Sequence, residues 1–381
     1  MSRRTNGEGS WGTKTIKGVR YFYYRDTDRS YTYGKSQKEI KEKLKKKQEQ
    51  KALQVNQTTT FGEYIKDWIS IKHNVVEDST YYVYEDIINS LLLNYKDYDL
   101  ANKQLHNLSP KVFQLYLNSL AENYSRASIT KIWQLITQCV KYGESQDEIK
   151  ANTLNMVKVP LESKVAVKKR EIPFVNSDEL NKLYDLLENS TDKRNVHRYK
   201  NSNNAHAIIL IAYTGMRVGE MTALKWKNVN LEERYIDIVE STGRIKDKNG
   251  KYVAVDKSTK TDTSNRRVPL PARGLEMIKY FDSFNPDHEP DDLVCLTANK
   301  TKIGRRNINR TLDSMCRDAN LPHMGIHSLR HSYGSILLER GVNIKTISNL
   351  LGHKNITTTY NIYIGVDEKT KEKAVTVLDE F

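Results

Sequence analysis

Apolar side chains recur at helical spacing between residue 59 and about residue 155. At the start of this stretch they occupy positions i, i+3, i+4 and i+7, as Phe61, Tyr64, Ile65 and Trp68. Further along, Ser109 followed by Pro110 is typical of the cap and first turn of a helix. The pattern predicts a helical bundle with helices at about 61–72, 79–95, 109–122 and 125–142.

The first part of the chain has a different pattern. Residues 16–35, "IKGVRYFYYRDTDRSYTYGK", contain short aromatic-rich runs separated by Asp and Gly, which predicts a small antiparallel sheet. Residues 36–53 are highly charged and begin with a Ser cap, which predicts a helix. A solvated helix after a disordered tail is the alternative, but the number of aromatic residues favours a small folded DNA-binding module.

Prolines and basic residues without a helical stripe occupy residues 158–174, which predicts an extended linker and a domain boundary. Beyond it, a capped helix and an apolar helix precede a strand-rich section from Tyr235 to Leu270, and further helices follow. The expected fold is therefore multidomain and mainly α, with a small N-terminal sheet and a second small antiparallel sheet in an α-rich last domain.

Charge and cysteine content narrow the function. The 381 residues carry 61 Lys and Arg against 47 Asp and Glu, a net charge of +14, which favours a polyanionic partner such as nucleic acid. Residues 1–55 alone supply +9, from 15 basic and 6 acidic residues. Three widely spaced cysteines favour a reducing compartment and argue against a disulfide framework or a zinc site. No signal peptide or membrane span is expected, so we expect a cytoplasmic protein.

Three stretches contain candidate chemistry. In "YTGMRVGEMTALKW", Arg217 follows a glycine that breaks an apolar helix, and Glu220 lies three residues on. In "GIHSLRHSYGSILL", His327 and Arg330 share one helical face. In "LLGHKN", His353 follows a glycine turn. Each alone has a structural explanation: Arg217 could pair with Glu220, His327 could cap a helix, and the glycine before His353 could end one.

Together these residues resemble the tyrosine recombinases, or phage integrase family. The matching stretches are "TGMRVGEMTALKW", "STKTDTSNRRVPL" and "HSLRHSYGSILLERGVNIKTISNLLGHKNITTTYNIYIGV", within residues 175–370. The layout is also similar to that of integrases from temperate phages and conjugative transposons. The resemblance implies an arm-type DNA-binding module at 1–57, a helical, SAM-like core-binding domain at 58–157, the linker at 158–174 and a catalytic domain at 175–381.

The resemblance also implies catalytic roles. Arg217 and Arg330 would hold the phosphate in the transition state, because forked guanidinium donors suit its non-bridging oxygens. His327 would exchange a proton with the nucleophile, and His353 would add a hydrogen-bond donor. Glu220 would orient an arginine or hold the active-site helix. No metal or cofactor is implied.

The general acid in this family is a lysine on a β-hairpin. Lys260 fits the family pattern in "TKTDTSNRRVPL", and Lys257 is the alternative. It would protonate the departing 5′-oxygen.

Two tyrosines compete for the role of nucleophile. Tyr360 and Tyr363 differ by about 60° around a helix and about 4.5 Å along it, so both hydroxyls cannot reach one point. The family places the nucleophile ten residues after the LGH histidine, which selects Tyr363, and Tyr360 then serves the core. Gly365 stands where many members have a histidine.

The last segment predicts a helix with an apolar side. Its apolar residues are Ala374, Val375, Val377, Leu378 and Phe381. This side could pack on its own domain, but the resemblance suggests that it docks on a neighbouring protomer.

The expected function is site-specific DNA recombination through a 3′-phosphotyrosyl intermediate, which integrates and excises a mobile element. The expected partners are double-stranded DNA at core and arm sites, a dimer per site, a tetramer at synapsis, and a DNA-bending or excision accessory protein. A type IB topoisomerase-like enzyme and a catalytically idle DNA-binding relative are the alternatives. The DNA sequence recognised and the preferred direction do not follow from one chain.

Overall fold

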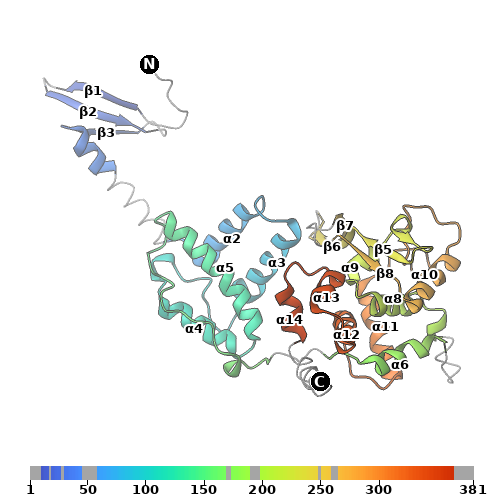
Figure 1. Cartoon of the computed structure of the whole chain (residues 1–381). Helices are drawn as coiled ribbons and strands as arrows, with labels where there is room; N and C mark the ends of the chain where they lie inside the picture. The colour runs from blue at the N-terminus through green and yellow to red at the C-terminus, as the bar shows by residue number, and fades with distance from the viewer. Residues whose placement is uncertain are drawn as a thin grey trace, which may run out of the picture. The chain divides into compact units, whose positions relative to one another are not determined.

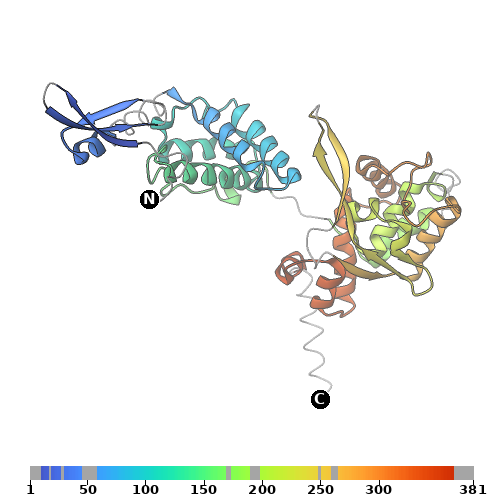
Figure 2. The same ribbon diagram turned by 90° about the horizontal axis from the view of Figure 1, so that it is seen from above.

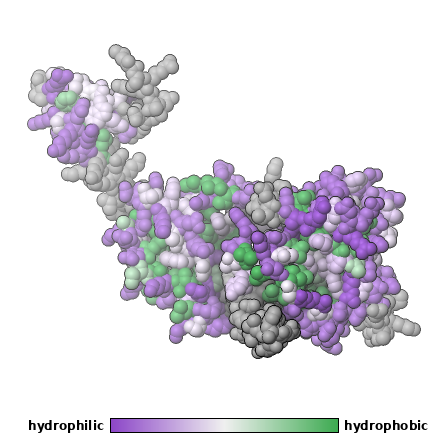
Figure 3. All heavy atoms as spheres, in the orientation of Figure 1, coloured by the Kyte–Doolittle hydropathy of each residue, from purple (hydrophilic) through white to green (hydrophobic). Residues whose placement is uncertain are grey.

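The structure is a computed structural model of the chain. It describes residues 10–16, 19–26, 30–44, 58–168, 173–188, 198–247, 250–258 and 265–363. The chain divides into two compact units, Met1–Lys169 and Arg170–Phe381, coloured in sequence order in Figure 1. None of the helices in the described ranges has the length and apolarity needed to cross a membrane. On the face shown in Figure 3, hydrophilic residues prevail over both units.

A three-stranded antiparallel sheet forms the start of the first unit, as predicted. Its strands are β1 (Ser10–Ile16), β2 (Val19–Arg25) and β3 (Tyr31–Gly34), in the order β1-β2-β3. Tyr23 of β2 packs edge-on against Tyr31, whose ring stacks on that of Tyr33. Residues 37–44 form a helix that buries Ile40 completely. The rest of the predicted helix, residues 45–53, lies outside the described residues.

Within residues 58–168, the structure describes four α-helices, and their bounds agree closely with the sequence pattern. They are α2 (Phe61–Lys72), α3 (Asp78–Ile88), α4 (Pro110–Ala121) and α5 (Arg126–Ser145). A π-helical turn, η1 (Asn89–Leu93), continues α3, and a 3-10 turn, η2 (Leu105–Asn107), precedes α4. Thr60 and Glu63 form a capping box at α2, and Ser109 caps α4 just before Pro110.

The segment after α5 stays close to the helical core. Residues 158–168 are mostly extended, with one 3-10 turn, η3 (Glu162–Lys164). Val165 is buried with the core of the helices, and the Ala166 N–H donates to the carbonyl of Ala121. The first part of the proposed linker is therefore packed rather than loose, because it carries an apolar side chain.

The second unit is built around α8 (Asn203–Thr214). This helix is apolar on all sides, so it is buried on all sides, with contacts to the surrounding helices (Figure 1). Those helices are α6 (Ser177–Glu188), α9 (Val218–Thr222), α10 (Ala272–Phe284), α11 (Arg305–Asp318) and α12 (Ile326–Glu339). The chain then continues through α13 (Ile344–Leu351) and α14 (Ile356–Tyr363).

The predicted strand-rich section forms two separate antiparallel pairings. The strands β4 (Val229–Asn230), β5 (Tyr235–Ile238) and β8 (Arg266–Pro269) form one sheet in the order β4-β5-β8, after a 3-10 turn, η4 (Trp226–Asn228). Among the described residues, the strands β6 (Glu240–Lys246) and β7 (Tyr252–Ser258) pair only with each other. Figure 2 shows this hairpin projecting from its unit as a long yellow ribbon.

Candidate active site

Arg217 is fixed at a sharp turn between α8 and α9. Gly215 ends α8 at φ 64°, and a side chain there would meet the ring of Tyr333 at 2.5 Å. Arg217 follows as the N-cap residue of α9, and its backbone N–H donates to Glu220 Oε2 at 2.7 Å. Its guanidinium donates to Oε1 of the same carboxylate at 2.6 Å. The turn therefore sets the direction of the Arg217 side chain.

Glu220 joins this arginine to a second one. Arg266, at the start of β8, donates from Nη1 to Oε1 at 3.0 Å and from Nη2 to Oε2 at 2.8 Å. The Glu220 side chain is only 2% exposed. Burial alone would raise the pKa of Glu220, but the hydrogen bonds and charges of Arg266 and Arg217 outweigh it and lower the pKa to about 2. The carboxylate is therefore ionised throughout the physiological range.

Three arginines meet at the C-terminal end of α13. Arg266 Nε donates to the carbonyl of Leu350 at 2.7 Å, and Arg217 Nη2 donates to that of Gly352 at 3.1 Å. Between them, Nη2 of Arg330 on α12 donates to the carbonyl of Leu351. The last carbonyls of a helix have no partner within it and carry the negative end of its dipole. Three successive carbonyls thus fix three guanidinium groups beside one another.

Arg330 also spans the site to its other side. Its Nη1 donates to the carbonyl of Gly215 at 2.5 Å, so the same side chain touches the turn before Arg217 and the end of α13. Arg330 is only 4% exposed, whereas the Arg217 side chain is 35% exposed. The two predicted phosphate-binding arginines are therefore held by shared backbone, with Arg217 the more open to an incoming anion.

His327 lies in the first turn of α12. Its Nε2 lies 3.0 Å from Arg305 Nη2 of α11, and because a guanidinium only donates, Nε2 must accept. Burial, then the charges of Arg305 and Arg330, lower the pKa of His327. A neutral imidazole with its proton on Nδ1 fits both observations, and its one lone pair, on Nε2, is then the one that accepts from Arg305.

His353 follows Gly352, which ends α13 at φ 64°. Its Nδ1 lies 2.7 Å from Oγ1 of Thr359, which is fully buried in α14. Burial, then the charges of Arg330 and Arg217, lower the pKa of His353 to about 4. This contact connects the arginine cluster to the helix that ends at Tyr363.

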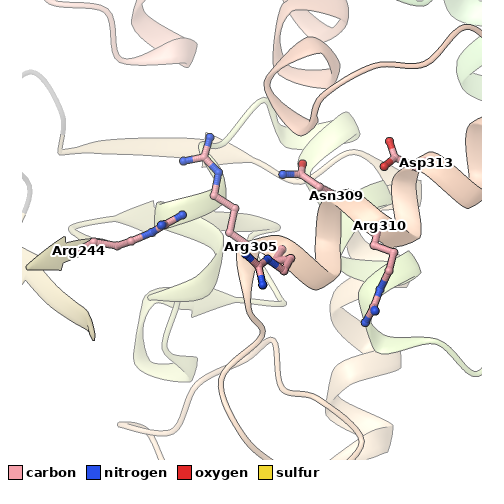
Figure 4. A pocket seen from close by; sticks show the side chains of 6 residues that line it. Arg244, Arg305, Asn309, Arg310 and Asp313 are labelled. Atoms are coloured by element: carbon pink, nitrogen blue, oxygen red, sulfur yellow. The ribbon is translucent and has the colours of Figure 1, made fainter. Parts of the chain in front are cut away.

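A basic hollow of about 370 Å³ lies next to His327. Its lining residues are Arg244 of β6 and Arg305, Arg306, Asn309, Arg310 and Asp313 of α11. Figure 4 shows Arg244 extending from the hairpin toward Arg305. The lining contains four arginines and one carboxylate, so the hollow favours an anion.

The structure leaves the other candidate residues partly undescribed. Lys260 falls among residues 259–264, which lie outside the described residues, while Lys257 lies on β7 opposite Ser241. Tyr360 is 51% exposed, so the expectation that it serves the core is wrong. Tyr363 is the last residue of α14, and its side chain lies outside the described part of the structure. The assignments of Lys260 and Tyr363 therefore stay predictions.

Arg266 and Arg305 belong to this site but received no role from the sequence. The position of Arg266 in β8 could have indicated that it points inward, because side chains two apart share a face of a strand and Val268 is fully buried. No comparable signal marks Arg305, because it lies at the start of an amphipathic helix rich in charge. Within the described ranges, no three His, Cys, Asp or Glu residues come together where they could hold a metal ion.

Two families of sequence match this chain. Residues 173–370 match the phage integrase family, and residues 60–121 match the phage integrase N-terminal SAM-like domain. A tyrosine recombinase XerC-like protein of Caldanaerobacter subterraneus subsp. tengcongensis is 26% identical, and the match covers 91% of this chain and 90% of that protein. The integrase of Staphylococcus phage L54a is 25% identical, over 87% of this chain and 95% of that integrase.

Solved structures show the same fold. The Tn1549 transposon integrase in complex with a circular intermediate DNA has a TM-score of 0.67 at 16% identity, covering 83% of this chain and 100% of that one. A lambda integrase dimer bound to a COC′ core site has a TM-score of 0.57 at 17% identity, covering 95% and 96%.

The family match spans more than half of the 381 residues and contains the whole arginine cluster. It also contains both histidines and the helix that ends at Tyr363. The chain therefore belongs to the phage integrase family and is a site-specific recombinase of the tyrosine type.

Proposed function

We propose that the chain integrates and excises a mobile element by cutting and rejoining DNA through a covalent bond between Tyr363 and a 3′-phosphate. One observation carries this proposal: Arg217 and Arg330 converge with His353 on the end of α13, ten residues before Tyr363. A cationic cluster so close to a helix that ends in a tyrosine suits attack by a phenol on a phosphodiester.

The chemistry follows from the charges. Attack on phosphorus puts extra negative charge on the non-bridging oxygens, and Arg217 and Arg330 stabilise it with guanidinium donors. The lowered pKa of His327 favours its neutral form, and its Nε2 accepts the proton of the Tyr363 hydroxyl after exchanging its hydrogen bond from Arg305 for that hydroxyl. The phosphorus–oxygen bond to the 5′-oxygen breaks, and Lys260 protonates that oxygen. A second 5′-hydroxyl then attacks the phosphotyrosine bond and releases Tyr363, so the number of phosphoester bonds is conserved without ATP.

The basic hollow beside His327 gives the DNA backbone a second contact. Arg244, Arg306 and Arg310 lie at its walls, on two separate elements. We place phosphates next to the cleaved bond there, because clustered guanidinium groups bind phosphate oxygens well. Relatives with this fold are described as bound to DNA, including a lambda integrase tetramer bound to a Holliday junction. This chain accordingly acts on double-stranded DNA as a dimer per site and a tetramer at synapsis.

The remaining parts take roles around the active site. We assign residues 1–57 to arm-site binding, 58–157 to core-site binding, 158–174 to a linker and 175–381 to catalysis, with the last helix docked on a neighbouring protomer. The matches at residues 60–121 and 173–370 support the core-binding and the catalytic assignments. A DNA-bending or excision protein assists, and the reaction takes place in the bacterial cytoplasm, on nucleoid DNA.

A nicked suicide substrate tests the function. The DNA carries the end sequence of the mobile element and loses its 5′-hydroxyl fragment after cleavage, which traps the covalent complex. We expect a denaturant-resistant protein–DNA adduct with the wild-type protein in EDTA. We expect the adduct to persist in Tyr360→Phe and to disappear in Tyr363→Phe.

The opposite results are equally informative. Loss of the adduct in Tyr360→Phe alone would assign the nucleophile to Tyr360. A strict Mg²⁺ requirement, or relaxation of supercoiled DNA without sequence preference, would contradict the proposed recombinase chemistry.

A further inference from the structure

Arg266 is buried in the arginine cluster, as Arg330 is. Its side chain is 6% exposed, and each guanidinium nitrogen donates to the protein itself: Nε to the Leu350 carbonyl, and Nη1 and Nη2 to Glu220. A side chain with all three nitrogens so engaged does not present its fork to a DNA phosphate. Any role it has in the reaction must therefore act through the groups that it holds.

Arg266 and the groups that it holds lie on three separate segments. Arg266 begins β8, six residues after Lys260; Glu220 lies in α9 beside Arg217; and Leu350 lies in the last turn of α13. The guanidinium also packs against Gly352, where an added Cβ would lie 2.9 Å from Nη1. One side chain thus joins the strand after the lysine segment, the Arg217 turn and the turn before His353.

The charge balance at Glu220 shows what Arg266 contributes. The buried carboxylate accepts from the side chain of Arg217 at 2.6 Å and from its backbone N–H at 2.7 Å. It accepts from the two Nη atoms of Arg266 at similar distances, 2.8 Å and 3.0 Å. Without Arg266, the full attraction of this carboxylate would fall on Arg217. A guanidinium held so tightly is less able to turn toward a phosphate, and an unshared buried charge is costly.

We propose that Arg266 is a positioning residue of the recombinase. By sharing the charge of Glu220 and fixing the end of α13, it leaves Arg217 free to bind the phosphate and holds it in register with Arg330 and His353. This inference rests on the proposed function, since it needs Arg217 to contact the cleaved phosphate.

The test compares Arg266→Met with a matched neighbour. Arg267 is the next residue of the same strand, but it is exposed, pairs with Asp237 and lies over the ring of Tyr235. We expect Arg266→Met to slow adduct formation on the suicide substrate by about 10- to 100-fold, with DNA affinity within about twofold of wild type. Arg266→Lys should recover part of the rate, because it keeps the charge and one bond. Arg267→Met should match the wild type in both measurements.

A double-variant cycle separates positioning from mere support of the fold. If Arg266 acts through Glu220, Arg266→Met combined with Glu220→Gln is no slower than Arg266→Met alone, because the unshared charge is gone. If the double variant forms the adduct more slowly by the product of the two single-variant factors, the inference is overturned. A loss of DNA affinity in Arg266→Met as large as its loss of rate would also overturn it. Thermal unfolding of each variant shows whether it is folded. If Arg266→Met is not folded, the rate of adduct formation is compared between Arg266→Lys and the wild type instead.

Failure of the inference is distinct from failure of the function. If the wild type forms the adduct and Arg266→Met forms it at the same rate, the inference is wrong and the function stands. If the wild type forms no adduct while it binds the DNA, the proposed function is wrong, and the inference falls with it.

Discussion

The carboxylate of Glu220 lies between two guanidinium groups, so its ionisation affects both stability and the direction of Arg217. The surrounding donors are the backbone N–H and side chain of Arg217, three residues away, and the side chain of Arg266, 46 residues away. Because the carboxylate is buried, its interactions are not screened as surface pairs are. A single residue thus links folding to the geometry of the active site.

Glu220→Gln should lower the stability in a pH-dependent way. The pKa of Glu220 is about 2 in the folded chain against an ordinary value of 4.5. A lowered folded pKa stabilises the fold above the unfolded pKa, and this stabilisation is lost as pH falls from about 5 toward 2. We expect a loss of roughly 3 kcal/mol at pH 7 that shrinks in that window. Denaturant unfolding at several pH values measures it.

A surface pair provides the control for this prediction. Asp237 pairs with Arg267 at 3.1 Å, and both side chains are well exposed. Asp237→Asn should change the free energy of unfolding by less than about 1 kcal/mol at any pH. A pH-independent loss in Glu220→Gln would contradict the ionised buried carboxylate.

Local spacing predicted the part of the site that is local. Arg217 and Glu220 are three residues apart, as are His327 and Arg330, and helical geometry makes such pairs neighbours. The contact of Arg266 with Glu220 spans 46 residues and that of Arg330 with Gly215 spans 115. Contacts of that kind depend on how the elements pack, which no spacing in the sequence encodes.

Among the elements, the C-terminal end of α13 organises the site most directly. The helix stops at Gly352 because the left-handed conformation suits glycine, and its last carbonyls, which have no partner within the helix, then accept from three arginines. The cations are favourable there for the same reason that basic residues are common in last turns of helices. The phosphate-binding groups are therefore placed by a helix terminus as well as by their own helices.

Gly352→Ala should impair both folding and cleavage, whereas Gly341→Ala should impair folding alone. Both glycines follow helices with positive φ, 64° and 81°, so alanine costs about 1–2 kcal/mol at either. An added Cβ at Gly341 meets nothing within 4 Å, but at Gly352 it lies 2.9 Å from Arg266. We expect slower adduct formation only in Gly352→Ala. Equal cleavage rates in the two variants would contradict the role of this turn.

The sequence pattern located helices better than strand pairings. The Ser109 cap, together with apolar periodicity, predicted the four helices of the first unit within a few residues. The π-helical turn after α3 was not distinguished from α-helix, since both keep the apolar side inward. The strand-rich section was predicted as one small sheet, yet in the part of it that the structure describes β6 and β7 pair only with each other. Alternation shows which side chains share a face but not which strands are neighbours.

For the molecule as a whole, net charge predicted the class of partner, and the structure locates part of that charge. Four of the 61 Lys and Arg side chains lie together at the hollow, namely Arg244, Arg305, Arg306 and Arg310. Long-range attraction from such a cluster would guide DNA toward the active site and would weaken as salt screens it.

Arg306→Gln combined with Arg310→Gln should weaken DNA binding and reduce its dependence on salt. For each arginine that no longer neutralises a phosphate, the slope of log affinity against log salt should fall by about 1. Lys279→Gln, an exposed change on α10, is the control and should lower the slope less. Fluorescence anisotropy across a salt series measures both. An unchanged slope in the double variant would contradict phosphate binding in the hollow.

The most direct test of tyrosine-mediated recombination is to identify the residue that is joined to DNA. The trapped complex from the suicide substrate is digested with protease and nuclease, and mass spectrometry locates the residue that carries the nucleotide. We expect a 3′-phosphodiester on the hydroxyl of Tyr363, formed in EDTA. A nucleotide on Tyr360, on any other residue, or joined through a 5′-phosphate would contradict the proposed mechanism.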